Sequence, residues 1–178
     1  MKGHYMPGYY TEDNDIKFFR NDFIINGENG GASTALIKGD VNLTDNSHFM
    51  TQTYGHSQTD HTTYHPREDF EKLSSTTIEG NVTVDRNSKL GAYSASDTFI
   101  EGNVTATNGG TISAWNSDAH LGINGDVLVT DENSQVGVGR TADIDIDGKL
   151  TAKNGADVYI GEESTLNEIG RASCRERV

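Results

Sequence analysis

The sequence predicts an all-β fold, a parallel β-helix whose short strands wind into stacked coils of about 22 residues. Three observations predict it. A seven-residue segment with alternating apolar and polar residues recurs five times, each copy is followed by a turn and a second strand, and the composition disfavours helices. The chain has 178 residues, of which 33% are hydrophobic, 20 are Gly and 2 are Pro. Such a composition favours short strands and turns over a large conventional core.

The repeat is the first element of each coil. Its copies read IKGDVNL from Ile37, IEGNVTV from Ile78, IEGNVTA from Ile100, INGDVLV from Ile123 and IDGKLTA from Ile146, at spacings of 41, 22, 23 and 23 residues. The odd positions hold Ile, Gly and further apolar residues, while the even positions are polar except for Leu128. A period of two predicts a strand with one buried face.

A turn and two further apolar positions complete the predicted coil. The turns are rich in Asn, Gly and small residues, which tolerate a positive φ, and they fall at residues 45–47, 86–88, 108–110, 132–134 and 154–156. A second strand follows, with apolar residues at Phe49, Leu90, Ile112, Val136 and Val158. A third apolar element precedes the later repeats, at Phe99, Leu121 and Ile144.

Every repeat carries a glycine at its third position, and these structural repeat residues are Gly39, Gly80, Gly102, Gly125 and Gly148. In a solenoid we expect them to stack as a column at an inward or corner position, where a side chain would collide with its neighbours. The alternative is a set of turn glycines unrelated to stacking.

Charge and cysteine content exclude several kinds of partner. The net charge of −13 repels phosphate backbones and anionic lipid, so no nucleic-acid partner is predicted. No apolar run approaches the ~20 residues of a membrane span, and Cys174, the single cysteine, excludes an intrachain disulfide.

The first residues lack the apolar core of a signal peptide. If the protein is exported, we expect its native start to lie upstream.

The segment 168–178, EIGRASCRERV, breaks this composition with three Arg and the only Cys. It resembles the translation of a sequencing-library adapter, so we expect a non-native tail. Removing its three Arg and two Glu from the 14 basic and 27 acidic residues leaves 11 and 25, a net charge of −14. A genuine basic tail is the alternative.

Acidic, cysteine-poor coils of the form G-[ND]-[VL]-T followed by an Asn or Gly turn resemble the passenger domains of bacterial autotransporters, over about residues 24–166. The resemblance implies a right-handed, pectin-lyase-like β-helix that is secreted or displayed at the cell surface, anchored in the outer membrane through a C-terminal barrel outside this chain. It implies a stalk with an adhesive role in virulence. Its partners would be a host surface protein, a glycan or another copy on a neighbouring cell.

On this interpretation residues 24–167 are the β-helix fragment, and residues 1–23 are a degenerate first coil or the remnant of a preceding module. The family also includes serine protease autotransporters, in which such a stalk supports a catalytic domain. Their G-D-S-G-S motif does not occur in this chain. We expect no catalytic residue and no cofactor here, and a polysaccharide-cleaving β-helix is disfavoured because no paired carboxylates recur.

The interval between the first two repeats exceeds one coil, and the excess falls near residues 51–75. We expect a loop excursion or one irregular coil, and recognition residues often occupy loops on a rigid scaffold. The candidates for binding are Tyr54, His56, His61, Tyr64 and His65. The three His are also metal candidates, but their spacings of five and four match no zinc motif, and a solvated loop is the alternative.

Two further motifs have a functional and a structural interpretation. Asp143, Asp145 and Asp147 resemble the start of a calcium loop, but Asn154 replaces the Glu at the twelfth position, so we expect an acidic strand face in water. Trp115 is either an exposed platform for carbohydrate or a packed aromatic residue.

Overall fold

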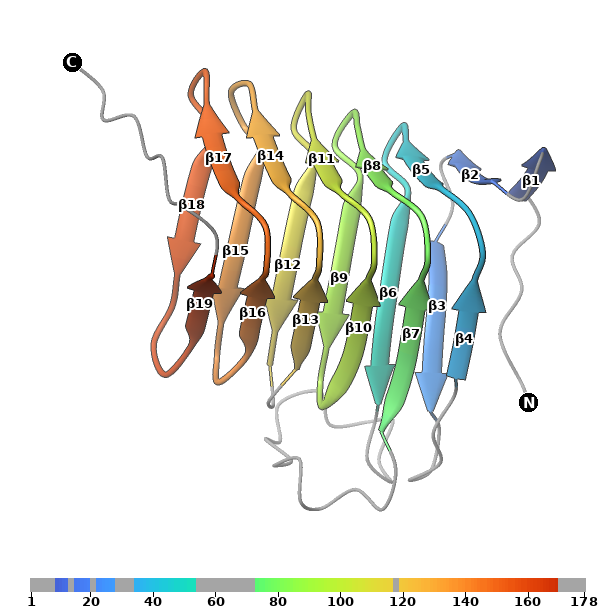
Figure 1. Cartoon of the computed structure of the whole chain (residues 1–178), viewed down its shortest axis with the longest axis horizontal. Coiled ribbons are helices and arrows are strands. Elements are labelled where there is room, and N and C mark those ends of the chain that lie inside the picture. The colour runs from blue at the N-terminus through green and yellow to red at the C-terminus, as the bar shows by residue number, and fades with distance from the viewer. Residues whose placement is uncertain are drawn as a thin grey trace.

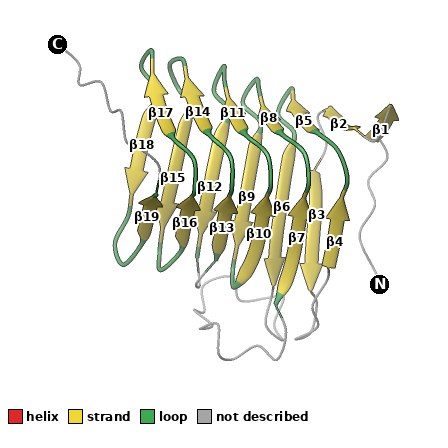
Figure 2. Cartoon of the chain, in the orientation of Figure 1, coloured by secondary structure: helices red, strands yellow, loops and turns green. Residues whose placement is uncertain are grey.

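The computed structural model describes residues 9–12, 15–19, 22–27, 34–53, 73–116 and 119–169. Over these residues the protein is a β-solenoid without a helix, and its coils stack along one long axis (Figures 1 and 2). The predicted all-β parallel solenoid is therefore confirmed, with about 23 residues in each turn.

Three parallel sheets form the sides of the solenoid. Sheet A contains β2 (Asp15–Phe19), β5 (Val41–Thr44), β8 (Val82–Val84), β11 (Val104–Ala106), β14 (Val127–Thr130) and β17 (Leu150–Lys153), with β1 (Tyr9–Glu12) antiparallel to β2 at its edge. Sheet B contains β3 (Asp22–Gly27), β6 (His48–Thr53), β9 (Lys89–Tyr93), β12 (Thr111–Trp115), β15 (Gln135–Gly139) and β18 (Asp157–Ile160). Sheet C contains β4 (Thr34–Ile37), β7 (Ser74–Ile78), β10 (Ser96–Ile100), β13 (His120–Ile123), β16 (Asp143–Ile146) and β19 (Thr165–Glu168).

The repeat segment forms a corner between two sheets, and the expectation of one continuous strand is wrong. In the first copy Ile37 ends β4, residues 38–40 turn the corner, and Val41 begins β5. Ile37 and Val41 both face the core. The alternation therefore continues through the bend, which is why a period of two alone does not reveal it.

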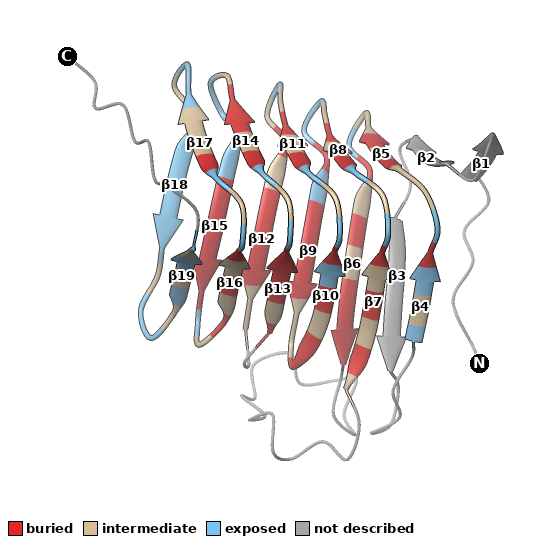
Figure 3. Ribbon diagram, in the orientation of Figure 1, coloured by how far each residue is buried: buried red, intermediate tan, exposed pale blue. Residues whose placement is uncertain are grey.

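The core consists of rows of apolar side chains that run along the solenoid axis. The register of sheet B aligns Phe49, Leu90, Ile112 and Val136, each of which is 0% exposed. Val158 continues the row but is 43% exposed, because the described chain adds no strand beyond β18 in this sheet. Figure 3 shows the same change from buried β15 to exposed β18.

The corners between sheets A and B lie at the predicted turns. Their backbone adopts positive φ at pairs of residues, as at Asp45 (57°) and Asn46 (63°). Positive φ also occurs at Arg86, Asn87, Asn108, Gly109, Asn154 and Gly155, and in the fourth corner at Asp131, one residue before the predicted turn, and at Asn133. Asn, Asp and Gly accept this conformation at little cost, which explains why they recur here.

Phe99 is not the equivalent of Leu121 and Ile144, with which the sequence grouped it. Thr98 pairs with the buried Leu121 and faces the core, whereas Phe99 pairs with Gly122 and is 40% exposed. Thr98 is tolerated inside because its hydroxyl donates to Thr51 Oγ1 at 2.9 Å, and that hydroxyl donates to Thr76 Oγ1 at 2.7 Å. Buried hydroxyls with partners avoid the cost of desolvation.

The structure describes only part of the predicted excursion, of the N-terminal segment and of the C-terminal tail. The excursion lies between β6 and β7, because residues 51–53 and 74–75 belong to those strands. Strands β2, β3 and β4 extend the three sheets, so a boundary at residue 23 falls within β3. Glu168 ends β19 and Ile169 donates its N–H to Ile146 O at 3.0 Å, so the segment 168–178 begins inside the solenoid, and its residues 170–178 lie outside the described ranges.

Candidate binding faces

The residues expected to bind in the excursion lie outside the described residues. Tyr54, His56, His61, Tyr64 and His65 fall within residues 54–72, and their role stays a prediction. Among the residues that the structure describes, no three His, Cys, Asp or Glu side chains gather closely enough to hold a metal ion.

The repeat glycines lie over one another at the corner between sheets C and A. A Cβ at Gly102 would lie 2.5 Å from Gly80 O, and one at Gly125 would lie 2.5 Å from Gly102 O. Gly39 and Gly148 occupy the equivalent positions in their coils, against Gly80 and Gly125 respectively. The corner therefore packs backbone on backbone and has no room for a side chain.

A ladder of side chains follows the glycine column, and sequence reasoning missed it. Asp40 Oδ1 accepts the backbone N–H of Asn81 at 2.6 Å, and Asn81 Oδ1 accepts that of Asn103 at 2.9 Å. In the same way, Asn103 Oδ1 accepts the backbone N–H of Asp126 at 2.8 Å, and Asp126 Oδ1 accepts that of Lys149 at 2.8 Å. The signal was present, since four of the five repeat glycines precede Asp or Asn. This ladder ties each coil to the next.

A charged group lies at the corner between sheets A and B. Arg86 bridges Asp45 of the preceding coil at 3.1 Å and Asp85 at 3.3 Å. Burial raises the pKa of Asp85, but hydrogen bonds from Asn108 and Thr107, together with the Arg86 backbone and charge, outweigh it and lower the pKa below its usual 3.8. The hydrogen bonds to Asp45, and the charges of both carboxylates, raise the pKa of Arg86. This group fastens neighbouring coils.

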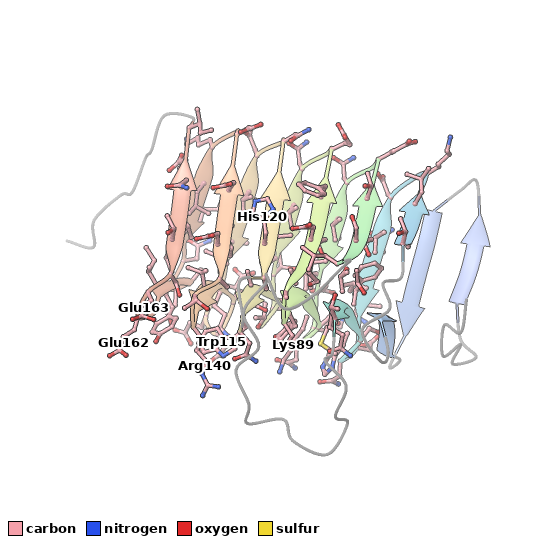
Figure 4. The ribbon with its side chains drawn as sticks, turned by 90° about the horizontal axis from the view of Figure 1, so that it is seen from below. Lys89, Trp115, His120, Arg140, Glu162 and Glu163 are labelled. Carbon is pink, nitrogen blue, oxygen red and sulfur yellow. The ribbon has the colours of Figure 1, made fainter. Side chains whose placement is uncertain are left out.

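The outer face of sheet B carries an aromatic shelf, which we define as Tyr93, Trp115 and Tyr159. The Trp115 and Tyr159 ring centroids lie 5.9 Å apart with their planes inclined by 26°. Trp115, Lys89 and Arg140 project on the same side of the solenoid, as do Glu162 and Glu163 (Figure 4). The sequence indicated only Trp115 of this shelf.

The outer face of sheet C is charged instead. His120 Nε2 lies 3.1 Å from Asp145 Oδ2, and its Nδ1 lies 3.8 Å from Asp97 Oδ1. Phe99 meets the edge of the His120 ring with centroids 5.4 Å apart. Asp143 and Asp145 alternate with buried Ile144 and Ile146 on β16, as the predicted acidic strand face requires, but Asp147 lies in the corner beyond the end of β16.

The fold and its two outer faces define the class of protein as a β-solenoid that presents side chains from successive coils on flat sheets. Comparison with protein family models, with curated proteins and with solved structures gives no match. Within the described ranges, no helix has the length and apolar character needed to cross a membrane.

Proposed function

We propose that this chain is a fragment of a secreted or surface-displayed autotransporter passenger, a structural stalk whose outer faces adhere to a host molecule or to another cell. The observation that carries the proposal is the repeated bonding between coils along one axis. Backbone ladders, the glycine column and the Asp/Asn ladder all join one coil to the next. An array bonded in this way forms an extended rod.

The outer surface supports an adhesive role for such a rod. Side chains of several coils line up on sheets B and C, so a partner can contact many turns at once. The net charge of −13 favours solubility outside the cell and opposes binding to phosphate-rich polymers.

Display on bacteria tests this proposal. Residues 1–169 would be placed between a signal peptide and the outer-membrane barrel of an autotransporter, with the barrel alone as control. We expect the solenoid to be detected by antibody on intact cells, and these cells to adhere to epithelial cells or to aggregate. Retention in the periplasm would contradict the proposal, and so would display without any gain in adhesion or aggregation over the control.

A further inference from the structure

We propose that the aromatic shelf is a binding site for a neutral oligosaccharide that lies across successive coils of sheet B. This inference rests on the adhesive role proposed above and names the chemistry of its ligand.

The Trp115 indole can lie flat on the sheet because Gly139 has no side chain in its way. The two residues pair in register, and a Cβ at Gly139 would lie 2.6 to 3.0 Å from indole carbons of Trp115. The glycine backbone therefore covers one side of the indole, and Trp115 is half-buried. The opposite side faces away from the sheet.

The two tyrosines extend this surface along the axis. Tyr159 pairs with Gly137 and is 51% exposed. The Tyr93 ring lies against Gly91, and its hydroxyl is 3.1 Å from Ser113 Oγ. Strands β9, β12 and β18 thus contribute aromatic rings to one glycine-floored surface.

Such a surface suits a sugar chain. A pyranose ring has an apolar C–H face that stacks on aromatic rings, and its hydroxyls need hydrogen-bonding partners at the rim. Gln135 and Asn116 supply neutral polar groups on or beside β12 and β15, whereas Ser113 is buried and its hydroxyl pairs with that of Tyr93. Rings that are held by the sheet lose little conformational entropy when the ligand binds.

The charge around the shelf favours a neutral ligand over an acidic one. The Arg140 guanidinium is held by Asn116 Oδ1 at 3.3 Å and can donate to a sugar hydroxyl. Glu162 and Glu163 project on the same side as Trp115 and offset the positive charges of Lys89 and Arg140 there (Figure 4), and the chain carries a net charge of −13. A polyanion therefore gains no net attraction on this side and is repelled by the chain as a whole, whereas a neutral saccharide is not.

Phe99 provides a matched control. Like Trp115 it is an outward aromatic residue that covers a glycine, since a Cβ at Gly122 would meet its ring at 3.0 Å. It lies on sheet C against His120, which in turn contacts Asp97 and Asp145, and no residue of the shelf belongs to that sheet. Phe99→Ala therefore removes the same kind of packing without touching the shelf.

The experiment uses the fact that Trp115 is the single tryptophan, so intrinsic fluorescence reports directly on the shelf. The full chain would be titrated with cellohexaose, xylohexaose and mannohexaose, and with hexagalacturonate as the acidic counterpart. We expect a saturable change in emission with at least one neutral hexasaccharide, and at least about tenfold weaker binding of hexagalacturonate at low salt.

Variants would be compared by calorimetry, with circular dichroism confirming that each is folded. Trp115→Ala and Tyr159→Ala should each weaken binding about tenfold, Trp115→Phe should retain part of it, and Phe99→Ala should leave it unchanged. The inference is overturned if no neutral hexasaccharide binds, if hexagalacturonate binds best, or if Trp115→Ala weakens binding no more than Phe99→Ala. The two failures are distinguishable: a failed titration leaves the display result standing, whereas lack of display refutes the stalk even where the titration detects binding at the shelf.

Discussion

Glycine has two different roles in this solenoid. In the corner column, backbone of the neighbouring coil occupies the place of the missing side chain, as Gly102 O does at Gly125. On the outer face of sheet B the missing side chain leaves room for an aromatic ring, as Gly139 does for Trp115. The same residue type therefore has different tolerance to substitution at the two places.

Gly125→Ala should destabilise the protein by about 2–3 kcal/mol, because its Cβ would collide with backbone that cannot move aside. Gly137→Ala is the matched control, since the nearest atom to its Cβ is Tyr159 Cβ at 3.8 Å, an ordinary contact. Its effect should stay within about 1 kcal/mol. Urea unfolding measures both, and equal losses would contradict the backbone-packed column.

Asp85 should make the stability depend on acidic pH. Its pKa is lowered in the folded state, so its carboxylate contributes stability above the unfolded value near 3.8, and that contribution is lost as the pH falls through the lower folded value. Asp85→Asn removes the titration. We expect the difference in unfolding free energy between native protein and Asp85→Asn to be constant from neutral pH to about 5 and to shrink below about 4. Urea unfolding at each pH would show this, and a constant difference throughout would refute it.

At the scale of the strand, the sequence predicted which apolar residues face the core more reliably than where the chain turns a corner. The row of Phe49, Leu90, Ile112 and Val136 was predicted in register because one apolar residue recurs ten or eleven residues after the repeat glycine. Whether that glycine lies at an inward position or at a corner was left open, because inward alternation continues through the bend.

The outer faces were less predictable. Phe99 was grouped with Leu121 and Ile144 because it is apolar, but Thr98 occupies the inward position and its hydroxyl has buried partners. The pairing of Trp115 with Gly139 depends on a 24-residue register across two strands, and no local pattern marks it. Aromatic residues on a solenoid surface therefore need the register of the sheets before they can be interpreted.

The Asp/Asn ladder should contribute measurably between strands. Asn103→Ala removes the acceptor of the Asp126 N–H and should cost about 1 kcal/mol. Asn124→Ala is the control in the next coil, because the Asn124 amide contacts only the exposed Glu101 carboxylate, at 3.1 Å. That variant should change the unfolding free energy by less than about 0.5 kcal/mol. Equal effects in urea unfolding would show that the ladder adds nothing.

At the scale of the whole molecule, stability accrues from neighbours. Each coil is held by the coils on either side through all three sheets, and one coil alone buries too little apolar surface to offset its conformational entropy. Val158 and Ile160 of the last described coil are exposed, because the described chain has no further coil to cover them.

Deletion of the 23 residues 104–126 should leave a folded, shorter solenoid. Val127 would follow Asn103 in the place of Val104, its partner in register. The rows of buried side chains and the glycine column would therefore be continuous again. We expect a retained β-type circular dichroism spectrum, a lower unfolding free energy and a smaller m-value. Deletion of residues 104–115 alone removes only strands β11 and β12 and should prevent cooperative folding. A folded protein from that half-coil deletion would contradict the periodic assembly.

The direction of the backbone hydrogen bonds between coils has a mechanical consequence. They run from coil to coil, parallel to the long axis, and the strands lie across it (Figure 1). A tensile load on one end therefore strains the bonds of the terminal coil first and leaves the others shielded. Each coil that unwinds would release about 80 Å of extended chain, from ~23 residues at about 3.4 Å each. In the stalk proposed above, such stepwise lengthening under shear would limit the force that reaches a bound partner.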